Sequence, residues 1–242
     1  MNSFPAIEID KVKAWDFRLI DENTAESLNV AYGVDSNYLD GVGVSITSIV
    51  INNRHVNLDF YIIADVYNDD FFQKVEKLAE QYQLRITLYR INTDNLQCLP
   101  CTQVWSRAMY FRLFAFQLLG VTLNRLLYLD ADVVCKGNIS QLLHLEFNGA
   151  VAAVVRDVDP MQEKAVVRLS DPELRGQYFN SGVVYLDLKK WTEAKLTEKA
   201  LSILMSKDSI YKYPDQDVMN VLLKGMTIFL PREFNTIYTC LL

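Results

Sequence analysis

The chain has 242 residues, of which 50% are hydrophobic and 22% charged, so it can bury a substantial core and is far from the composition of a disordered segment. Its net charge is -6 and its Lys and Arg residues are scattered, which excludes the basic surface that nucleic-acid binding requires. No apolar run approaches the roughly 20 residues that span a bilayer, and the four cysteines are too few for a disulfide framework. We therefore expect a cytoplasmic protein without an export signal that does not bind nucleic acid.

The first part of the chain alternates short apolar strands with helices whose apolar residues recur at helical spacing. The expected elements are a strand at Leu28–Val34, a helix at Tyr38–Asn52, a strand at Leu58–Ala64, a helix capped by Asp69 and Asp70 that runs to about Tyr82, and a strand at Leu84–Arg90. Two strand–helix units in succession favour parallel pairing, because the helix returns the chain to the same end of the sheet.

The same alternation continues in the second part of the chain. It predicts a helix at Ser106–Leu119, strands at Arg125–Leu129, Ala150–Val155 and Gly182–Leu188, and helices at Trp191–Met205 and Asp217–Leu223. The whole pattern predicts an α/β fold with a mostly parallel sheet flanked by helices.

Two stretches fall outside this alternation. Residues 1–27 are acidic and aperiodic, so we interpret them as an N-terminal extension packed on the single domain formed by residues 28–242. Residues 157–178 are the longest stretch without an expected element, and a loop of that length predicts a lid or an acceptor-binding segment.

The segment Asp130-Ala131-Asp132 carries the clearest chemical signal, because it follows the apolar strand at Arg125–Leu129. Residues two apart in an extended chain point to the same side, so the two carboxylates converge at the end of that strand. Converging like charges are costly unless a cation lies between them, and Mg²⁺ or Mn²⁺ prefers such oxygen ligands. The alternative is that one Asp caps a turn and the other is solvated.

Three further segments place polar side chains beside expected strands or helices, and each also has a structural explanation. Gly33-Val-Asp35-Ser-Asn37-Tyr38 suits hydrogen bonding and stacking of a nucleotide base, or is a polar turn. Phe179-Asn180-Ser181-Gly182 precedes an expected strand and suits close approach to sugar hydroxyls. Tyr213-Pro-Asp215-Gln216-Asp217 opens a helix, where acidic residues also serve as caps.

With these motifs in view, the chain resembles the family-eight glycosyltransferases, and among them the bacterial lipopolysaccharide core hexosyltransferases. The matching motifs recur in family order from Val30 to Asn235. They are the turn at Asp35, Asn37 and Tyr38, the Tyr110-Phe-Arg112 helix, the Asp-Ala-Asp triplet, Phe-Asn-Ser-Gly followed by Leu-Lys-Lys-Trp191, and the Asp-Gln-Asp helix. The resemblance implies that residues 28–242 form a GT-A catalytic domain.

The resemblance also implies a role for each matched residue. Gly33, Asp35, Asn37 and Tyr38 would hold uridine and ribose, Arg112 would reach the phosphate and sugar region, and Asp130, Ala131 and Asp132 would bind the donor, with the two carboxylates on the metal. Asp157, Asn180, Ser181 and Gly182 would contact the transferred sugar, and Asp215 and Gln216 would flank its anomeric carbon.

One family motif is not found: a His-x-x-Gly-x-x-Lys-Pro-Trp segment, whose His completes the metal shell and whose Lys contacts the diphosphate. The chain ends at Leu242 without it, and a basic, aromatic membrane-contact segment is also missing. We therefore expect a truncated chain with impaired activity.

From this resemblance we expect a metal-dependent, retaining transferase that moves glucose or galactose from UDP-glucose or UDP-galactose to the lipopolysaccharide outer core. Peripheral contact with the cytoplasmic face of the inner membrane would apply to a longer form, and the oligomeric state is open. The alternatives are a sugar-phosphate nucleotidyltransferase, a chain or scaffold that binds UDP-sugar without transferring it, and a self-glucosylating primer protein. A nucleotidyltransferase would require a basic, glycine-rich loop after the first strand, whereas the turn after the strand at Leu28–Val34 is acidic.

Overall fold

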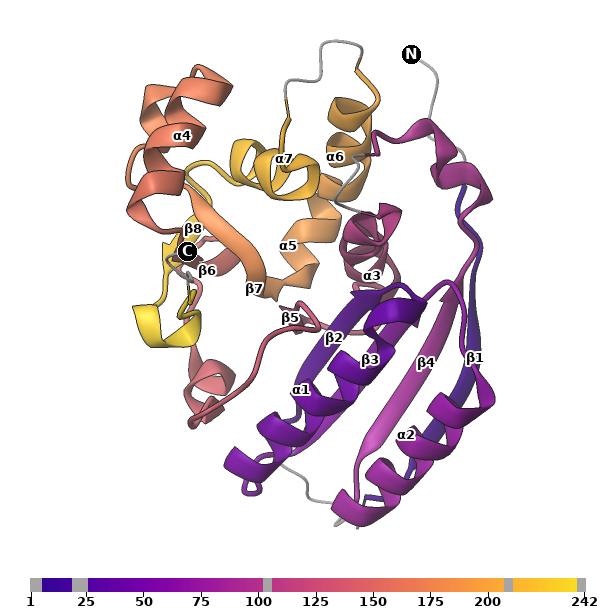
Figure 1. Ribbon diagram of the computed structural model, residues 1–242. Helices are drawn as coiled ribbons and strands as arrows, with labels where there is room; N and C mark the ends of the chain where they lie inside the picture. Colours follow the sequence, from indigo (N-terminus) through magenta and orange to yellow (C-terminus); the bar gives the residue numbers. More distant parts are fainter. Residues whose placement is uncertain (1–5, 19–25, 102–105, 207–210, 239–242) are drawn as a thin grey trace.

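The computed structural model describes residues 6–18, 26–101, 106–206 and 211–238. The strands of this part form one sheet in the order β1-β4-β3-β2-β5-β7-β6-β8 (Figure 1). The strands are β1 (Ile9–Asp16), β2 (Leu28–Val34), β3 (Leu58–Ala64), β4 (Arg85–Ile91), β5 (Arg125–Leu129), β6 (Ala152–Arg156), β7 (Phe179–Asp187) and β8 (Thr227–Phe229). The α-helices are α1 (Leu39–Asn52), α2 (Asp69–Tyr82), α3 (Phe111–Leu119), α4 (Asp159–Leu169), α5 (Leu188–Glu193), α6 (Leu196–Leu204) and α7 (Pro214–Leu222).

The sheet has a parallel centre and a mixed flank. The strands β4, β3, β2 and β5 pair in parallel, and so do β6 and β8. The pairs β1 with β4, β5 with β7, and β7 with β6 are antiparallel. The predicted α/β fold, with a mostly parallel sheet flanked by helices, is confirmed.

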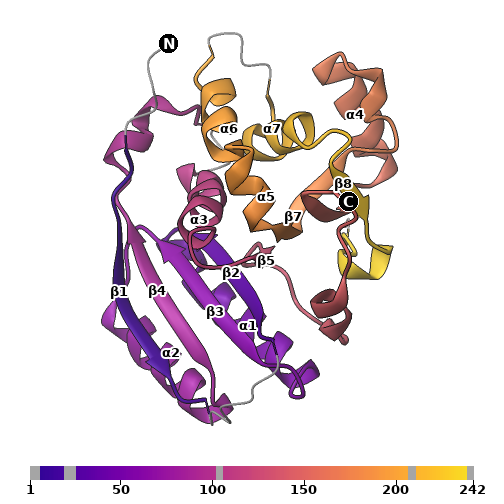
Figure 2. The same cartoon turned by 180° about the vertical axis from the view of Figure 1, so that it is seen from behind.

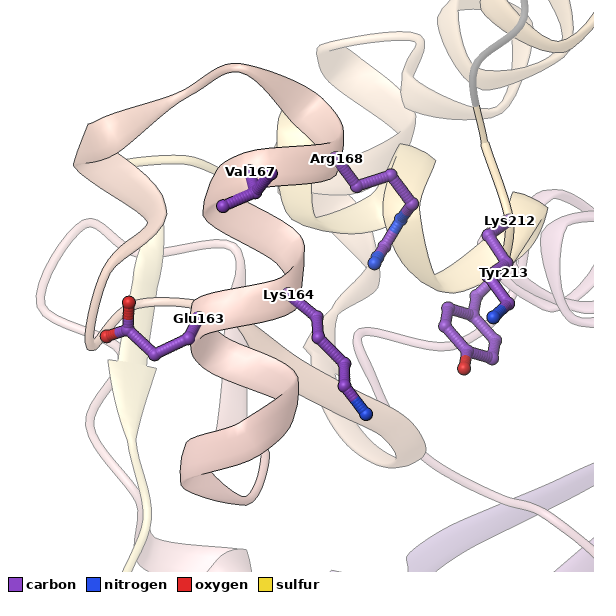
Figure 3. A pocket seen from close by; sticks show the side chains of 6 residues that line it. All are labelled: Glu163, Lys164, Val167, Arg168, Lys212 and Tyr213. Carbon is purple, nitrogen blue, oxygen red and sulfur yellow. The ribbon is translucent and has the colours of Figure 1, made fainter.

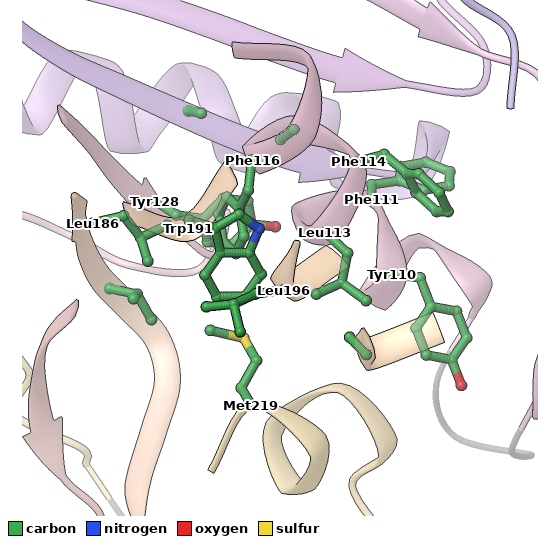
Figure 4. Packing of buried hydrophobic residues seen from close by; sticks show 14 of the residues in the cluster. Tyr110, Phe111, Leu113, Phe114, Phe116, Tyr128, Leu186, Trp191, Leu196 and Met219 are labelled. Carbon is green, nitrogen blue, oxygen red and sulfur yellow. The ribbon is translucent and has the colours of Figure 1, made fainter. Parts of the chain in front are cut away.

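Helices cover both faces of the parallel centre, and alternate strand residues pack against them (Figures 1 and 2). On β2, Val30 and Tyr32 join the core beneath α1 and α2, whereas Ala31 joins the core on the face of α3, α5 and α6. This second core is rich in aromatic rings: Phe116 lies edge-on to both Tyr128 and Trp191, with ring centroids 5.5 and 5.0 Å away (Figure 4). Strand residues buried on both faces explain the nearly continuous apolar runs in the sequence.

Three predicted strands, at Leu28–Val34, Leu58–Ala64 and Arg125–Leu129, coincide with β2, β3 and β5. The predicted caps of α2 are wrong. The cap is Asn68, whose side-chain oxygen accepts from the Phe71 backbone N–H at 2.7 Å, while Asp69 and Asp70 lie in the first turn. An uncharged amide at this position satisfies an otherwise unpaired helix N–H.

Other predicted boundaries differ from the structure. The predicted helix at Trp191–Met205 is broken between α5 and α6, where Lys195 has a φ of 50°. The predicted strand at Gly182–Leu188 begins earlier, at Phe179, so the Phe-Asn-Ser-Gly segment is part of β7. Smaller shifts affect the predicted elements at 84–90, 106–119, 150–155 and 217–223, which correspond to β4, a 3₁₀ turn followed by α3, β6 and α7.

The loop predicted at residues 157–178 is also wrong, because α4 occupies half of it and a 3₁₀ turn follows at Pro172–Leu174. The helix ends where Ser170 takes a φ of 51°, a left-handed conformation that stops the helix. Ala165, Leu174 and Tyr178 form a small apolar cluster of their own beneath it. Because only a few apolar residues of α4 are buried, the helical spacing of apolar residues in this part of the sequence is weak.

The N-terminal segment contributes a strand that the sequence did not predict. β1 pairs with β4 at the edge of the sheet, and Trp15 is buried there with its indole N–H donating to Glu76 Oε1 at 3.0 Å. Residues 1–5 and 19–25 of the expected extension lie outside the described residues, and the division of the chain at residue 27 stays a prediction. Within the described residues, no helix is both long and apolar enough to cross a membrane.

Candidate active site

The topology brings polar residues from distant parts of the chain to one edge of the sheet. β2 and β5 are parallel, so Asp35 and Asp130, which follow them, lie at the same edge. β7 runs antiparallel to β5 and β6, so it begins at this edge with Asn180, while β6 ends there before Asp157. The carboxyl ends of strands in open α/β sheets are where ligands bind.

Arg112 on α3 holds two carboxylates of this edge together. Its Nη2 donates to Asp130 Oδ1 at 2.7 Å, and its Nε lies 3.1 Å from Asp215 Oδ2 on α7. Its Nη1 donates to the Ser181 carbonyl at 2.7 Å, and the guanidinium lies 4.8 Å from the centre of the Tyr128 ring. The side chain is buried, so each of these contacts is made in surroundings that strengthen electrostatic interactions.

The surroundings of Asp130 raise its pKa to about 6. Loss of hydration is the largest cause, and the charges of Asp215 and Asp132 add to it, although Arg112 opposes them. Asp132 itself is exposed to solvent. Asp130, Asp132 and Asp215 together carry more negative charge than Arg112 offsets.

This donor set fits a hard divalent cation, which would neutralise the excess charge through carboxylate oxygens. A Cβ on Gly182 would lie 3.0 Å from Asp130 Oδ2 and from Asn180 Oδ1, so the glycine leaves room for both side chains. Within the described residues, no group of three or more His, Cys, Asp and Glu side chains could hold a metal by itself. A cation held by Asp130 and Asp132 would need substrate oxygens and water to complete its ligand shell.

Gln216 on α7 is the centre of a buried hydrogen-bonded network. Its Oε1 accepts from the Ser181 backbone N–H at 3.0 Å, and its Nε2 donates to Asp157 Oδ2 and to the Tyr178 hydroxyl, both at 3.0 Å. Asn180 also donates to Gln216 Oε1, at 3.4 Å. Because donors and acceptors surround the amide on opposite sides, its orientation is fixed. Burial raises the pKa of Asp157, although the hydrogen bonds that its carboxylate accepts lower it in part.

A second layer of side chains supports this network from behind. Tyr178 donates its hydroxyl hydrogen to Asp217 Oδ1 at 2.6 Å and so presents a lone pair to Gln216. Asp217 is completely buried, and both its oxygens are engaged by the Arg168 guanidinium from α4. A buried carboxylate needs such a partner, because an unpaired charge there would be very costly. α4 is thereby tied to α7 next to Gln216.

The turn after β2 (residues 33–38, the β2 turn) is organised by its own side chains. Asp35 Oδ1 accepts from the Asn37 backbone N–H at 3.0 Å, and Asp35 Oδ2 accepts from the Ser106 hydroxyl at 2.7 Å. The Tyr38 side chain is 56% exposed. Gly33 is required here, since a Cβ would lie 2.8 Å from Phe111 Cβ. The turn therefore presents an exposed ring beside a fixed carboxylate.

The structure brings the predicted site residues together in three groups. Asp130 and Asp215 share Arg112, Asp157 and Asn180 share Gln216, and the β2 turn joins them through Tyr128, whose hydroxyl accepts from Gly33 N at 3.2 Å. Asn37, Tyr38 and Asp132 are exposed, and within the described residues no side-chain hydrogen bond or ion pair joins them to Arg112 or Gln216.

Several residues of the site were not predicted from the sequence. They are Ser106, Tyr128, Arg168, Tyr178, Asn220 and Asn235. Most of them contact other site residues from behind, and the elements that carry them pack together only in the folded chain. Arg168 and Tyr178 also fall in the segment that was interpreted as a loop. For these residues, the one indication in the sequence was Asp217. It is the second acid of Asp-Gln-Asp and lies close to apolar residues, so its carboxylate predicts a buried partner of opposite charge.

Comparison with known sequences tests the family directly. The profile described as Glycosyl transferase family 8 matches residues 29–241. The chain belongs to glycosyltransferase family 8. This assignment selects the transferase interpretation over a sugar-phosphate nucleotidyltransferase, and the chain is accordingly a glycosyltransferase.

Relatives of assigned activity match nearly the whole chain. A lipopolysaccharide 1,2-glucosyltransferase of Escherichia coli (strain K12) is 88% identical over 99% of this chain and 71% of its own length. A lipopolysaccharide 1,3-galactosyltransferase of Salmonella typhimurium (strain LT2) is 35% identical, over 91% of this chain and 67% of its own. These enzymes are therefore longer than the region that they share with this chain.

Solved structures share the fold at low sequence identity. The galactosyltransferase LgtC, in complex with donor and acceptor sugar analogs, superposes with a TM-score of 0.71 at 22% identity, over 85% of this chain and 74% of the other. A structure of an active-site mutant of LgtC gives a TM-score of 0.75 at 20% identity, over 85% of this chain and 73% of the other. The architecture is of the GT-A type.

Proposed function

We propose that the chain transfers glucose or galactose, with retention at the anomeric carbon, from a UDP-sugar to the outer core of a lipopolysaccharide. The choice of sugar and acceptor is supported by the lipopolysaccharide glucosyl- and galactosyltransferases that match the chain at 88% and 35% identity. In this proposal, residues 28–242 are the catalytic domain and the protein works peripherally at the cytoplasmic face of the inner membrane.

The observation that carries the proposal is the Arg112 clamp, which holds Asp130 and Asp215 at the end of β5. Asp130 and Asp132 would hold Mg²⁺ or Mn²⁺, since both carboxylates lie at an edge with excess negative charge. When bound, the divalent ion stabilises the negative charge that develops on the departing diphosphate. Arg112 keeps the Asp130 carboxylate oriented before any ligand arrives.

The other site residues position the two sugars in this proposal. Asp35 and Asn37 would hydrogen-bond uridine and ribose, Tyr38 would stack on the base, and the Gln216 network would fix the face of the transferred sugar. Asn180 and Ser181 lie at the start of β7 next to Gly182, whose missing side chain leaves room for the Asn180 and Asp130 side chains. Arg112 would reach the phosphate and sugar region, and its bonds to Asp130, Asp215 and Ser181 support a further role in holding the site together.

The test is a panel of UDP-glucose, UDP-galactose, ADP-glucose and GDP-mannose with Mn²⁺, scored by nucleotide release with and without lipopolysaccharide core acceptor. We expect release from one or both UDP-hexoses that rises when acceptor is present. Comparable turnover of ADP-glucose or GDP-mannose would remove the uridine assignment. Binding of UDP-hexose without acceptor-dependent release would instead favour a chain that binds the donor but does not transfer it.

A further inference from the structure

A groove of about 500 Å³ lies between α4 and the residues that lead into α7, and it shares Arg168 with the network behind Gln216. It lies on the segment that the sequence marked as a lid or an acceptor-binding stretch. Figure 3 shows the side chains that line it: Glu163, Lys164, Val167, Arg168, Lys212 and Tyr213. Its walls combine aliphatic stems and one aromatic ring with several cations.

The charge of the groove is positive, although the chain as a whole carries a net charge of -6. Lys164 and Arg168 extend from α4 toward the segment of Lys212 and Tyr213, whereas Glu163 points away from them (Figure 3). Glu163 is engaged by Arg175 at 3.1 Å on that other side. The one acidic residue of the lining therefore does not neutralise the groove.

The two lysines supply this positive charge. Arg168 is neutralised by the buried carboxylate of Asp217. Lys164 and Lys212 are exposed, and neither lies within 4.0 Å of a carboxylate in the part of the chain that the structure describes. Two ammonium groups across one groove repel each other, so a ligand with negative charge would be favoured between them.

The groove adjoins the candidate active site through α7. The Tyr213 backbone N–H donates to Asp217 Oδ2 at 3.1 Å, and Arg168 binds the same carboxylate from α4. Asp215 and Gln216 follow Tyr213 in the first turn of α7. A molecule bound in the groove thus lies against the element that carries the residues proposed to flank the anomeric carbon.

We propose that the groove binds a phosphate group carried by the acceptor saccharide, with Lys164 and Lys212 as its two cationic ligands. A phosphomonoester carries nearly two negative charges at neutral pH, which matches two lysines better than a carboxylate does. Lysine binds phosphate as a point charge, so the exposed, flexible side chains suit the task. The inference rests on the proposed function for the identity of the acceptor.

The test compares a core oligosaccharide acceptor before and after phosphatase treatment, with wild type and the double variant Lys164→Gln/Lys212→Gln. Wild type is expected to show a KM for the phosphorylated acceptor roughly tenfold below that for the dephosphorylated one, from two charge-assisted contacts at low salt. The double variant should show the higher KM with both acceptors, with kcat within about twofold of wild type. The variant Lys77→Gln/Lys199→Gln, which removes the same charge from α2 and α6, should behave as wild type.

Calorimetry of the two oligosaccharides without donor gives a readout that does not depend on transfer. A preference for the phosphorylated form that the double variant loses supports the groove even if no transfer occurs, in which case only the proposed function fails. Equal KM and equal binding for both acceptors in wild type would overturn the groove proposal and leave the proposed function standing. If the double variant instead loses only binding to anionic lipid vesicles, the groove recognises headgroups and the proposal is wrong.

Discussion

The β2 turn and the Gln216 network lie at the same edge of the sheet, but they are held in different ways. Asp35 bonds within its own turn and to one residue of the segment before α3. Gln216 bonds to groups from β7 and from the segments on either side of α4, and Tyr178 and Asp217 support it from behind. The first part of the site is local and exposed, whereas the second is interlocked and buried.

Because of this difference, substitutions in the two regions should have different effects on stability and on catalysis. In the β2 turn, a side chain can change with little effect on folding, because water replaces the lost contacts. In the Gln216 network, removal of one partner leaves another buried polar group unsatisfied, so stability and catalysis should fall together. The following predictions test this separation.

The largest effect is expected from Asp217→Ala, which leaves the Arg168 guanidinium and the Tyr178 hydroxyl without their shared partner. Breaking a buried ion pair from one side costs about 3–5 kcal/mol, so the urea midpoint and the melting temperature should fall clearly. Asp40→Ala is the control, because Asp40 is an exposed partner of Lys74 and its loss should cost less than about 1 kcal/mol. Similar losses in the two variants would contradict the distinction.

Asp132→Asn should lower Mn²⁺-dependent UDP affinity roughly a hundredfold, or about 2.7 kcal/mol, without changing the unfolding midpoint. Asp132 is exposed, so its carboxylate serves no described packing role. Calorimetric titration of UDP with Mn²⁺ measures the effect, and chelation of the metal from wild type should reproduce it. The assignment of Asp132 to the metal would be withdrawn if the variant kept wild-type affinity.

Tyr178→Phe should lower stability by about 1–2 kcal/mol and also lower kcat roughly tenfold, with the donor KM unchanged. The hydroxyl is removed from between Asp217 and Gln216, so the amide loses one of the bonds that fix its orientation and keeps those to Asp157 and Ser181. Urea unfolding and steady-state kinetics measure the two effects.

The matched control for this substitution is Tyr67→Phe. The Tyr67 hydroxyl contacts the carbonyl oxygens of Ile62 and Tyr89 at 2.8 and 2.9 Å, in the half of the sheet distant from Gln216. We expect a comparable loss of stability with full kcat. Equal kcat in the two variants would show that Tyr178 serves packing alone.

The smallest effect is expected from Asp35→Asn. Asparagine caps turns as well as aspartate, so the unfolding free energy should stay within about 0.5 kcal/mol of wild type. UDP affinity should fall about fivefold, or about 1 kcal/mol, because a neutral acceptor forms weaker hydrogen bonds than a carboxylate. Fluorescence titration with UDP measures this change, and a large loss of stability would show that the β2 turn is not independent of the core.

The sequence by itself determined the elements whose apolar pattern is long or whose borders are sharp. β2, β3 and β5 were predicted to the residue, because Val, Ile, Leu and aromatic residues fill them and polar residues follow at once. It also determined that Asp130 and Asp132 end a strand, and, through the family motifs, which residues belong at the site. These features depend on neighbours in the chain, which a sequence displays directly.

Only the tertiary structure decided which side chains meet. α4 was interpreted as a loop because it is held by few apolar residues and by the pairing of Arg168 with Asp217, a residue 49 positions away. The split between α5 and α6 and the edge strand β1 likewise depend on packing against elements far along the chain. A buried polar network needs all its partners at once, and their convergence depends on strand order, which periodicity does not encode.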